Sequence, residues 1–150
     1  MRPYLKSAIS LLTLIALVTV FCKSLAYREQ ADSAKADMLF ERGQLFEQNG
    51  QMDSAAYYYR QAITMLPVAR DDRRACIFRN RLGKLFLDVN LFPMAETVYR
   101  EAMDCVPDGD DKTELSKATR GLGKSFLFRG ITDSALVYLN QAVRLTSSVS

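Results

Sequence analysis

The 150-residue chain reads LGKLFLDVNLFPMAETVYREAMDCVP over residues 82–107. The positions of its Gly, its first Phe and its two Ala residues recur 40 residues earlier and 40 residues later. Gly43, Gly83 and Gly123 keep this spacing, and the copies align without a gap. The other columns at the same period are Phe46, Phe86 and Phe126; Ala55, Ala95 and Ala135; Ala62, Ala102 and Ala142; and, less strictly, Tyr59, Tyr99 and Leu139. Self-similarity at a fixed period of this size is the signature of a repeat protein.

Within each copy the spacing is helical. Gly83 and Phe86 are three residues apart, and Ala95, Tyr99 and Ala102 follow one another at steps of four and three, which place side chains on one face of a helix. Residues that tolerate a left-handed backbone separate the two halves, at Gly50, Asn90 and Gly130. Each copy is therefore predicted to be helix, tight turn, helix, in an all-α fold. The expected helices cover residues 32–49, 53–66, 71–89, 92–106, 111–129 and 132–146.

The pattern resembles the tetratricopeptide repeat, in which a Gly, an aromatic residue, a small residue, a second aromatic residue, an Ala and a closing Pro follow in order. In the middle copy the matching residues are Leu82, Gly83, Phe86, Ala95, Tyr99, Ala102 and Pro107. The resemblance implies a right-handed superhelical solenoid of three repeats, at about residues 32–69 (unit one), 70–109 (unit two) and 110–148 (unit three). The period of 40 exceeds the roughly 34 residues usual in that family, and the surplus falls between units.

Residues 1–26 are predicted to be a secretory signal peptide. Arg2 and Lys6 precede an apolar run that ends at Cys22, and Ser24-Leu25-Ala26 fits the small-x-small cleavage pattern. The mature domain would then be residues 27–150, exported across a bacterial inner membrane and periplasmic or secreted. A buried core helix fits less well, because the run is apolar on all its faces.

Two other interpretations of the N-terminal segment stay open. An uncleaved segment could anchor the chain through residues 7–22, which as a helix would span about 24 Å against a hydrocarbon core of about 30 Å. Lipid attachment at Cys22 is the other, although Phe21 stands where bacterial lipoprotein signals have a small residue.

Composition argues against several classes of function. The chain has no His, which removes Ser-His and Cys-His catalysis and the commonest metal ligand. No paired carboxylates or activated nucleophile replace it, so we expect a protein that is not an enzyme and has no cofactor or metal site. Beyond residue 26 the 17 basic residues equal the 17 acidic ones, which argues against nucleic-acid binding.

The resemblance implies that the first helices of the units line a concave, peptide-binding face. The candidate groove residues are Phe40, Gln44, Asn80, Arg81, Lys84, Lys117, Arg120, Lys124 and Phe128. Units two and three supply the cations, so the expected partner is a protein or peptide with an acidic segment or a C-terminal carboxylate. Some family members grip a C-terminus through a clamp of Lys and Asn, which Phe40 and Gln44 do not reproduce. A merely solvated, charged helix face is the alternative interpretation.

Two further features lie outside the groove. Cys76 and Cys105 could pair as a disulfide in an exported chain, or be two small buried side chains. The predicted last helix carries apolar residues with no capping helix after it, which favours self-association or a covering partner.

Two functions compete at this stage. The first is a non-catalytic interaction or assembly module that binds a partner polypeptide. The second is the sensory repeat portion of a bacterial envelope signalling protein in a shortened form, with a membrane segment and a kinase or regulator elsewhere.

Overall fold

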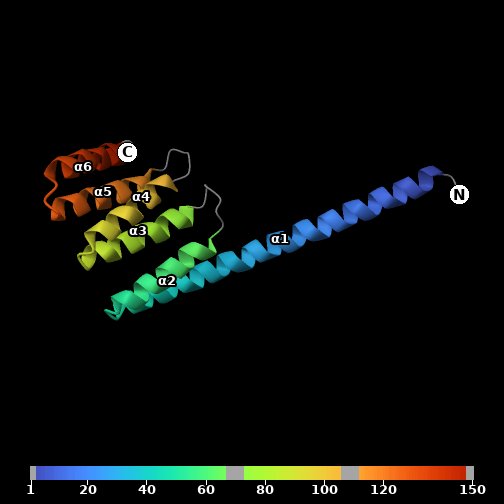
Figure 1. The fold of residues 1–150 in the computed structure, drawn as a ribbon, viewed down its shortest axis with the longest axis horizontal. Helices are drawn as coiled ribbons and strands as arrows, with labels where there is room; N and C mark the ends of the chain where they lie inside the picture. The colour runs from blue at the N-terminus through green and yellow to red at the C-terminus, as the bar shows by residue number, and fades with distance from the viewer. Residues whose placement is uncertain (1–2, 67–72, 106–111, 148–150) are drawn as a thin grey trace.

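A computed structural model describes residues 3–66, 73–105 and 112–147, with side chains from residue 16 onward (Figure 1). The helices in these ranges are α1 (Pro3–Gln48), α2 (Met52–Met65), α3 (Arg73–Asp88), α4 (Phe92–Asp104), α5 (Thr113–Phe128) and α6 (Thr132–Ser147). The pairs α1–α2, α3–α4 and α5–α6 correspond to units one, two and three. Apart from the start of α1, every helix end lies within two residues of its predicted position.

The turns inside the pairs have the backbone that the sequence predicts. Gly50, Asn90 and Gly130 have φ angles of 73°, 61° and 77°. At the first turn the amide of Gln51 donates to the carbonyl of Phe46 at 2.9 Å, and the amide of Leu91 repeats this bond to Phe86 at 2.8 Å. The left-handed residue thus closes each first helix and reverses the chain.

Helix α1 begins much earlier than the predicted residue 32. It runs unbroken through Ala26, and its N-terminal half extends away from the other helices (Figure 1). No Gly or Pro lies between Pro3 and Gly43, so nothing in the sequence stops the helix where the repeats begin. In this extension Leu17, Val20 and Phe21 are exposed. Signal cleavage, anchoring and lipidation therefore stay predictions.

No helix in the described part of the chain has the combined length and apolar character needed to cross a membrane.

Much of the core comes from the columns that repeat every 40 residues, and residues such as Phe78, Leu85 and Val98 complete it. The six alanines of the two Ala columns are all buried, as are Tyr59 and Tyr99. A Cβ added to Gly83 would lie 2.8 Å from Cε1 of Tyr99, and one added to Gly43 would lie 2.6 Å from Cδ1 of Tyr59. Each glycine therefore makes room for the large side chain of its own unit, which explains the pairing of small and large residues.

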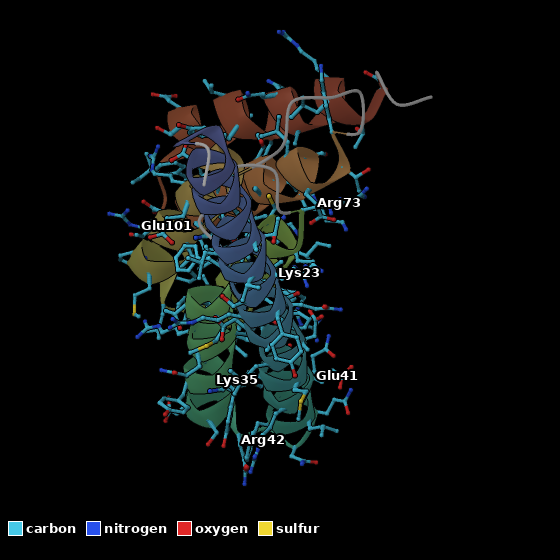
Figure 2. All side chains as sticks on the ribbon, turned by 90° about the vertical axis from the view of Figure 1, so that its right-hand side faces the viewer. Lys23, Lys35, Glu41, Arg42, Arg73 and Glu101 are labelled. Carbon is cyan, nitrogen blue, oxygen red and sulfur yellow. The ribbon has the colours of Figure 1, made fainter. Side chains whose placement is uncertain are left out.

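Several contacts join unit one to unit two along the first helices, among them the ion pair of Arg74 with Asp37 at 3.3 Å. The ring of Phe40 stacks on that of Phe78 with centroids 3.9 Å apart. Nearer the turn, Nε of Arg81 lies 2.8 Å from Oε2 of Glu47. Viewed along α1, α1 and α3 lie on one side of the stack and α2 and α4 on the other, and Arg73 of α3 and Glu101 of α4 are on opposite sides (Figure 2).

The outer face of α6 leaves large apolar side chains open. Leu136, Val137 and Val143 are 55%, 64% and 65% exposed. Self-association through this face stays a prediction. Pro67 and Pro107, the predicted closing prolines, lie outside the described residues.

Candidate functional site

A groove of about 450 Å³ crosses α1, α3 and α5. Of the nine predicted groove residues, eight line it: Phe40, Gln44, Asn80, Arg81, Lys84, Lys117, Arg120 and Lys124. They come together because helical steps of three and four residues keep one face of each first helix directed to the same side.

Phe128 does not line the groove with the other eight residues. Its ring stacks on Phe92 at the start of α4, with centroids 5.5 Å apart, and it is 61% exposed. Each step of four residues turns a helix by about 40°, so two steps beyond Arg120 carry this side chain off the groove face.

The groove also contains residues outside the predicted set, among them Leu87, Glu114 and Tyr99. Tyr99 belongs to α4, one of the second helices, whereas the resemblance places the groove on the first helices. It nevertheless lines the groove, because glycines of α3 and α5 leave space for its ring. Cβ atoms added to Gly83 and Gly121 would lie 2.8 Å from its Cε1 and 2.2 Å from its Cζ. Gly121 lies in α5, two residues before Gly123 of the repeating column. This additional glycine is the feature of the sequence that indicates space for the Tyr99 ring in α5.

The groove holds more basic than acidic groups. Arg81, Lys84, Lys117, Arg120 and Lys124 line it, against the carboxylates Asp88 and Glu114. The predicted excess of positive charge on units two and three is therefore present in one hollow.

Arg81 is held by unit one. Its Nε donates to Oε2 of Glu47 at 2.8 Å, and the hydroxyl of Tyr59 donates to the same oxygen at 2.5 Å. The Glu47 side chain is 12% exposed, so this pair is screened by water less than a surface pair. Glu47 therefore cancels much of the charge that Arg81 would offer to a ligand.

Two lysines of the groove also have carboxylate partners. Nζ of Lys117 lies 2.7 Å from Oε1 of Glu114, whose side chain is 7% exposed, and Lys84 pairs with Asp88 one turn along α3. Nδ2 of Asn80 donates to Oε2 and to the backbone oxygen of Glu114, at 2.9 and 3.0 Å. Asn80 therefore serves to join α3 to the start of α5.

Arg120 and Lys124 differ from these three cations. Both are exposed side chains of α5, and neither makes an ion pair or hydrogen bond with any residue that the structure describes. They are one helical turn apart, so their charges act on the same part of the groove.

Burial controls the ionisation of the two core tyrosines. It raises the pKa of Tyr59 well above the usual value, and the hydrogen bond to Glu47 adds to that effect. It raises the pKa of Tyr99 as well, with the nearby charge of Asp88 raising it further and that of Arg120 opposing it. Both phenols are therefore neutral donors at physiological pH.

The described residues contain no group of three or more Cys, Asp or Glu side chains placed to hold a metal ion. Outside the groove, Cys76 and Cys105 are adjacent thiols whose Sγ atoms lie 2.7 Å apart. Both interpretations from the sequence, a disulfide or two small buried side chains, therefore stay open.

No protein-family model and no curated protein matches the chain. Two solved structures are similar to it. The second TPR of Spaghetti (RPAP3), bound to the HSP90 peptide SRMEEVD, is 19% identical, with a TM-score of 0.65 over 82% of this chain and 96% of that one. The Arabidopsis OM64 TPR domain is also 19% identical, with a TM-score of 0.62 over 76% of this chain and 84% of that one. The chain thus has a TPR-like helical fold, as its columns of Gly, aromatic and Ala residues predict.

Proposed function

We propose that this protein is a non-catalytic interaction module that binds an acidic, extended segment of a partner polypeptide in the groove across α1, α3 and α5. The observation that carries the proposal is the excess of cations in that groove, five against two carboxylates. The similarly folded TPR of Spaghetti is bound to a peptide that ends in EEVD, which supports a peptide ligand for this shape of groove.

The chemistry of the groove suits peptide capture better than catalysis. Its cations lie on rigid helices, and apolar groups such as Phe40 and Leu87 lie beside them. A carboxylate gains from ordered cationic donors, while the apolar floor accepts neighbouring side chains. The sequence contains no His, so the groove cannot hold a Ser-His or Cys-His pair.

Export remains part of the proposal. Arg2 and Lys6 ahead of an apolar run, followed by Ser24-Leu25-Ala26, support a signal segment. The module would then meet its partner outside the cytoplasm, in the periplasm or beyond.

Fluorescence anisotropy with the full-length chain tests the binding function. The probes are three capped peptides of equal length, rich in Glu and Asp, in Gln and Asn, or in Lys. We expect the acidic peptide to bind and the other two to bind at least about tenfold more weakly, with the difference shrinking as salt rises. Equal binding of all three, or no binding of the acidic peptide, would contradict the proposal.

A matched pair of variants locates the binding surface. Replacing Lys117, Arg120 and Lys124 together with Ala should weaken binding of the acidic peptide by about tenfold or more. Replacing Lys35 and Arg144, which are exposed cations of α1 and α6 outside the groove, should leave it unchanged. Equal effects of the two sets would place the binding surface elsewhere.

A further inference from the structure

The two core tyrosines, Tyr59 and Tyr99, occupy the same register but have different surroundings. The hydroxyl of Tyr59 donates to Glu47, which also accepts from Arg81. Forty residues on, the positions of Glu47 and Arg81 are held by Leu87 and Gly121. Unit two therefore lacks both the acceptor and the cation that fix the hydroxyl in unit one.

Tyr99 is consequently a free donor at the floor of the groove. Its ring lies against Gly83 and Gly121, and only 4% of the residue is exposed. Its hydroxyl makes no hydrogen bond with any residue in the described part of the chain. Tyr99 lines the groove together with Asp88 and Arg120, whose charges act on its pKa in opposite directions. Although the ring is buried, the hydroxyl is accessible from the groove, so a ligand oxygen bound there can act as its acceptor.

The cations without acid partners lie at the same end of the groove. Arg120 is the residue before Gly121, against which the phenol packs, and Lys124 is one turn further along α5. Asp88, the carboxylate near Tyr99, is already paired with Lys84. A ligand carboxylate bound there would accept a hydrogen bond from the neutral Tyr99 hydroxyl and lie near the unpaired charges of Arg120 and Lys124. Charge-assisted hydrogen bonds of this kind favour anion binding.

We propose that the Tyr99 hydroxyl, Arg120 and Lys124 form a carboxylate-binding subsite at the junction of α3 and α5. The subsite rests on the proposed function, and it names where the acidic segment is anchored. Arg81, Lys84 and Lys117 also line the groove but are not part of the subsite. Their charges are already neutralised by ion pairs with Glu47, Asp88 and Glu114. The carboxylate comes either from a Glu or Asp side chain or from a peptide C-terminus.

The test removes the Tyr99 hydroxyl alone. Tyr99→Phe keeps the ring that packs between Gly83 and Gly121, so the fold is retained. We expect it to weaken binding of the acidic peptide to the full-length chain about tenfold, since hydrogen bonds to charged groups have that strength. Arg120→Ala should weaken binding about fivefold. The matched control is Tyr57→Phe, which removes an exposed hydroxyl of α2 outside the groove and should change nothing.

Peptide variants identify the carboxylate that is bound. Each Glu is changed to Gln in turn, and the C-terminus is left free or amidated. The substitution that removes the subsite carboxylate should weaken binding to the wild-type chain and have almost no effect on Tyr99→Phe combined with Arg120→Ala. If that substitution is the amidation, the occupant is a terminal carboxylate; if it is one Glu to Gln, the occupant is a side chain.

The failures are distinguishable. If the wild-type chain binds the acidic peptide and Tyr99→Phe binds it equally well, the subsite is wrong and the proposed function stands. If the wild-type chain binds no acidic peptide, the proposed function fails and the subsite fails with it.

Discussion

Tyr99 is enclosed by residues with no side chain, and this close packing has a measurable consequence. A Cβ at Gly121 would lie 2.2, 2.4 and 2.6 Å from Cζ, Cε1 and Cε2 of the ring. The ring cannot move toward α3, because Gly83 is in similarly close contact with it. Relief would need a shift of α4 against α5.

Gly121→Ala should therefore destabilise the protein by about 1–3 kcal/mol, the usual cost of overpacking. Urea unfolding followed by circular dichroism measures the change. The helix propensity of Ala acts in the opposite direction by about 1 kcal/mol, so a stabilised variant would show that the contact is not tight.

A second substitution provides the control for that experiment. Leu139 occupies the Tyr99 register position in unit three, where it packs on Gly123. Tyr99→Leu should therefore cost less in the Gly121→Ala background than in the wild-type chain, because the smaller side chain leaves room for the new methyl group. Additive costs would mean that the two positions do not interact.

The pair α3–α4 also brings the two thiols of the repeats together. Sγ of Cys76 donates to the backbone oxygen of Cys105 at 2.8 Å, and Cys76 is fully buried while Cys105 is half-buried. Burial raises the pKa of the Cys76 thiol to about 12, and the side-chain hydrogen bond between the two thiols adds to the effect. At neutral pH the Cys76 thiol is therefore protonated and a poor nucleophile.

Oxidised glutathione should convert this pair into an intramolecular disulfide in a Cys22→Ser background. Cys105 attacks the glutathione disulfide and releases one glutathione; Cys76 then displaces the second, with both thiol protons lost to solvent. The second step should accelerate as pH rises. Mass mapping should find the loss of two hydrogens, and the unfolding free energy should rise by about 3.6 kcal/mol for a loop of 29 residues. A stable glutathione adduct on Cys105 would contradict the prediction, and Cys105→Ser is the control.

The helices could be predicted from the sequence because their signals are local. The Gly and Asn turn residues and the steps of three and four give the ends of α2 to α6 within two residues. The start of α1 could not be predicted, since the repeat pattern begins near residue 32 and nothing in the sequence marks whether a helix precedes it.

The groove was partly predictable for the same reason. Helical periodicity identifies the face of α5 that carries Lys117, Arg120 and Lys124. It does not show that Glu114 neutralises the first of these or that Glu47 neutralises Arg81, because such pairings depend on how one helix is placed against another. The position of Tyr99 between two first helices depends on that placement as well.

At the scale of the whole molecule, ionisation of the core tyrosines limits stability at high pH. In the unfolded chain a tyrosine loses its proton near pH 10. Burial raises the pKa of both Tyr59 and Tyr99 in the folded chain, so the unfolded form binds fewer protons above that pH. The stabilisation is therefore complete below about pH 10 and is lost as pH rises beyond it.

We expect the unfolding free energy to fall progressively between about pH 10 and 12. Denaturant titrations across that range measure the fall. Lysines also lose their charge there, so the matched comparison is the variant with Tyr59→Phe and Tyr99→Phe, in which the decline should be shallower. An identical decline in both proteins would show that the tyrosines are not its cause.

The continuity of α1 has a mechanical consequence. At 1.5 Å per residue this helix is about 70 Å long, and more than half of it precedes unit one. Its last turns carry Phe40 and Gln44 of the groove and Glu47, which holds Arg81. In the uncleaved chain, a twist or pull applied near the N-terminus would be transmitted along this one helix to one wall of the groove. Immobilising or loading that end would then change how tightly the opposite end grips a ligand.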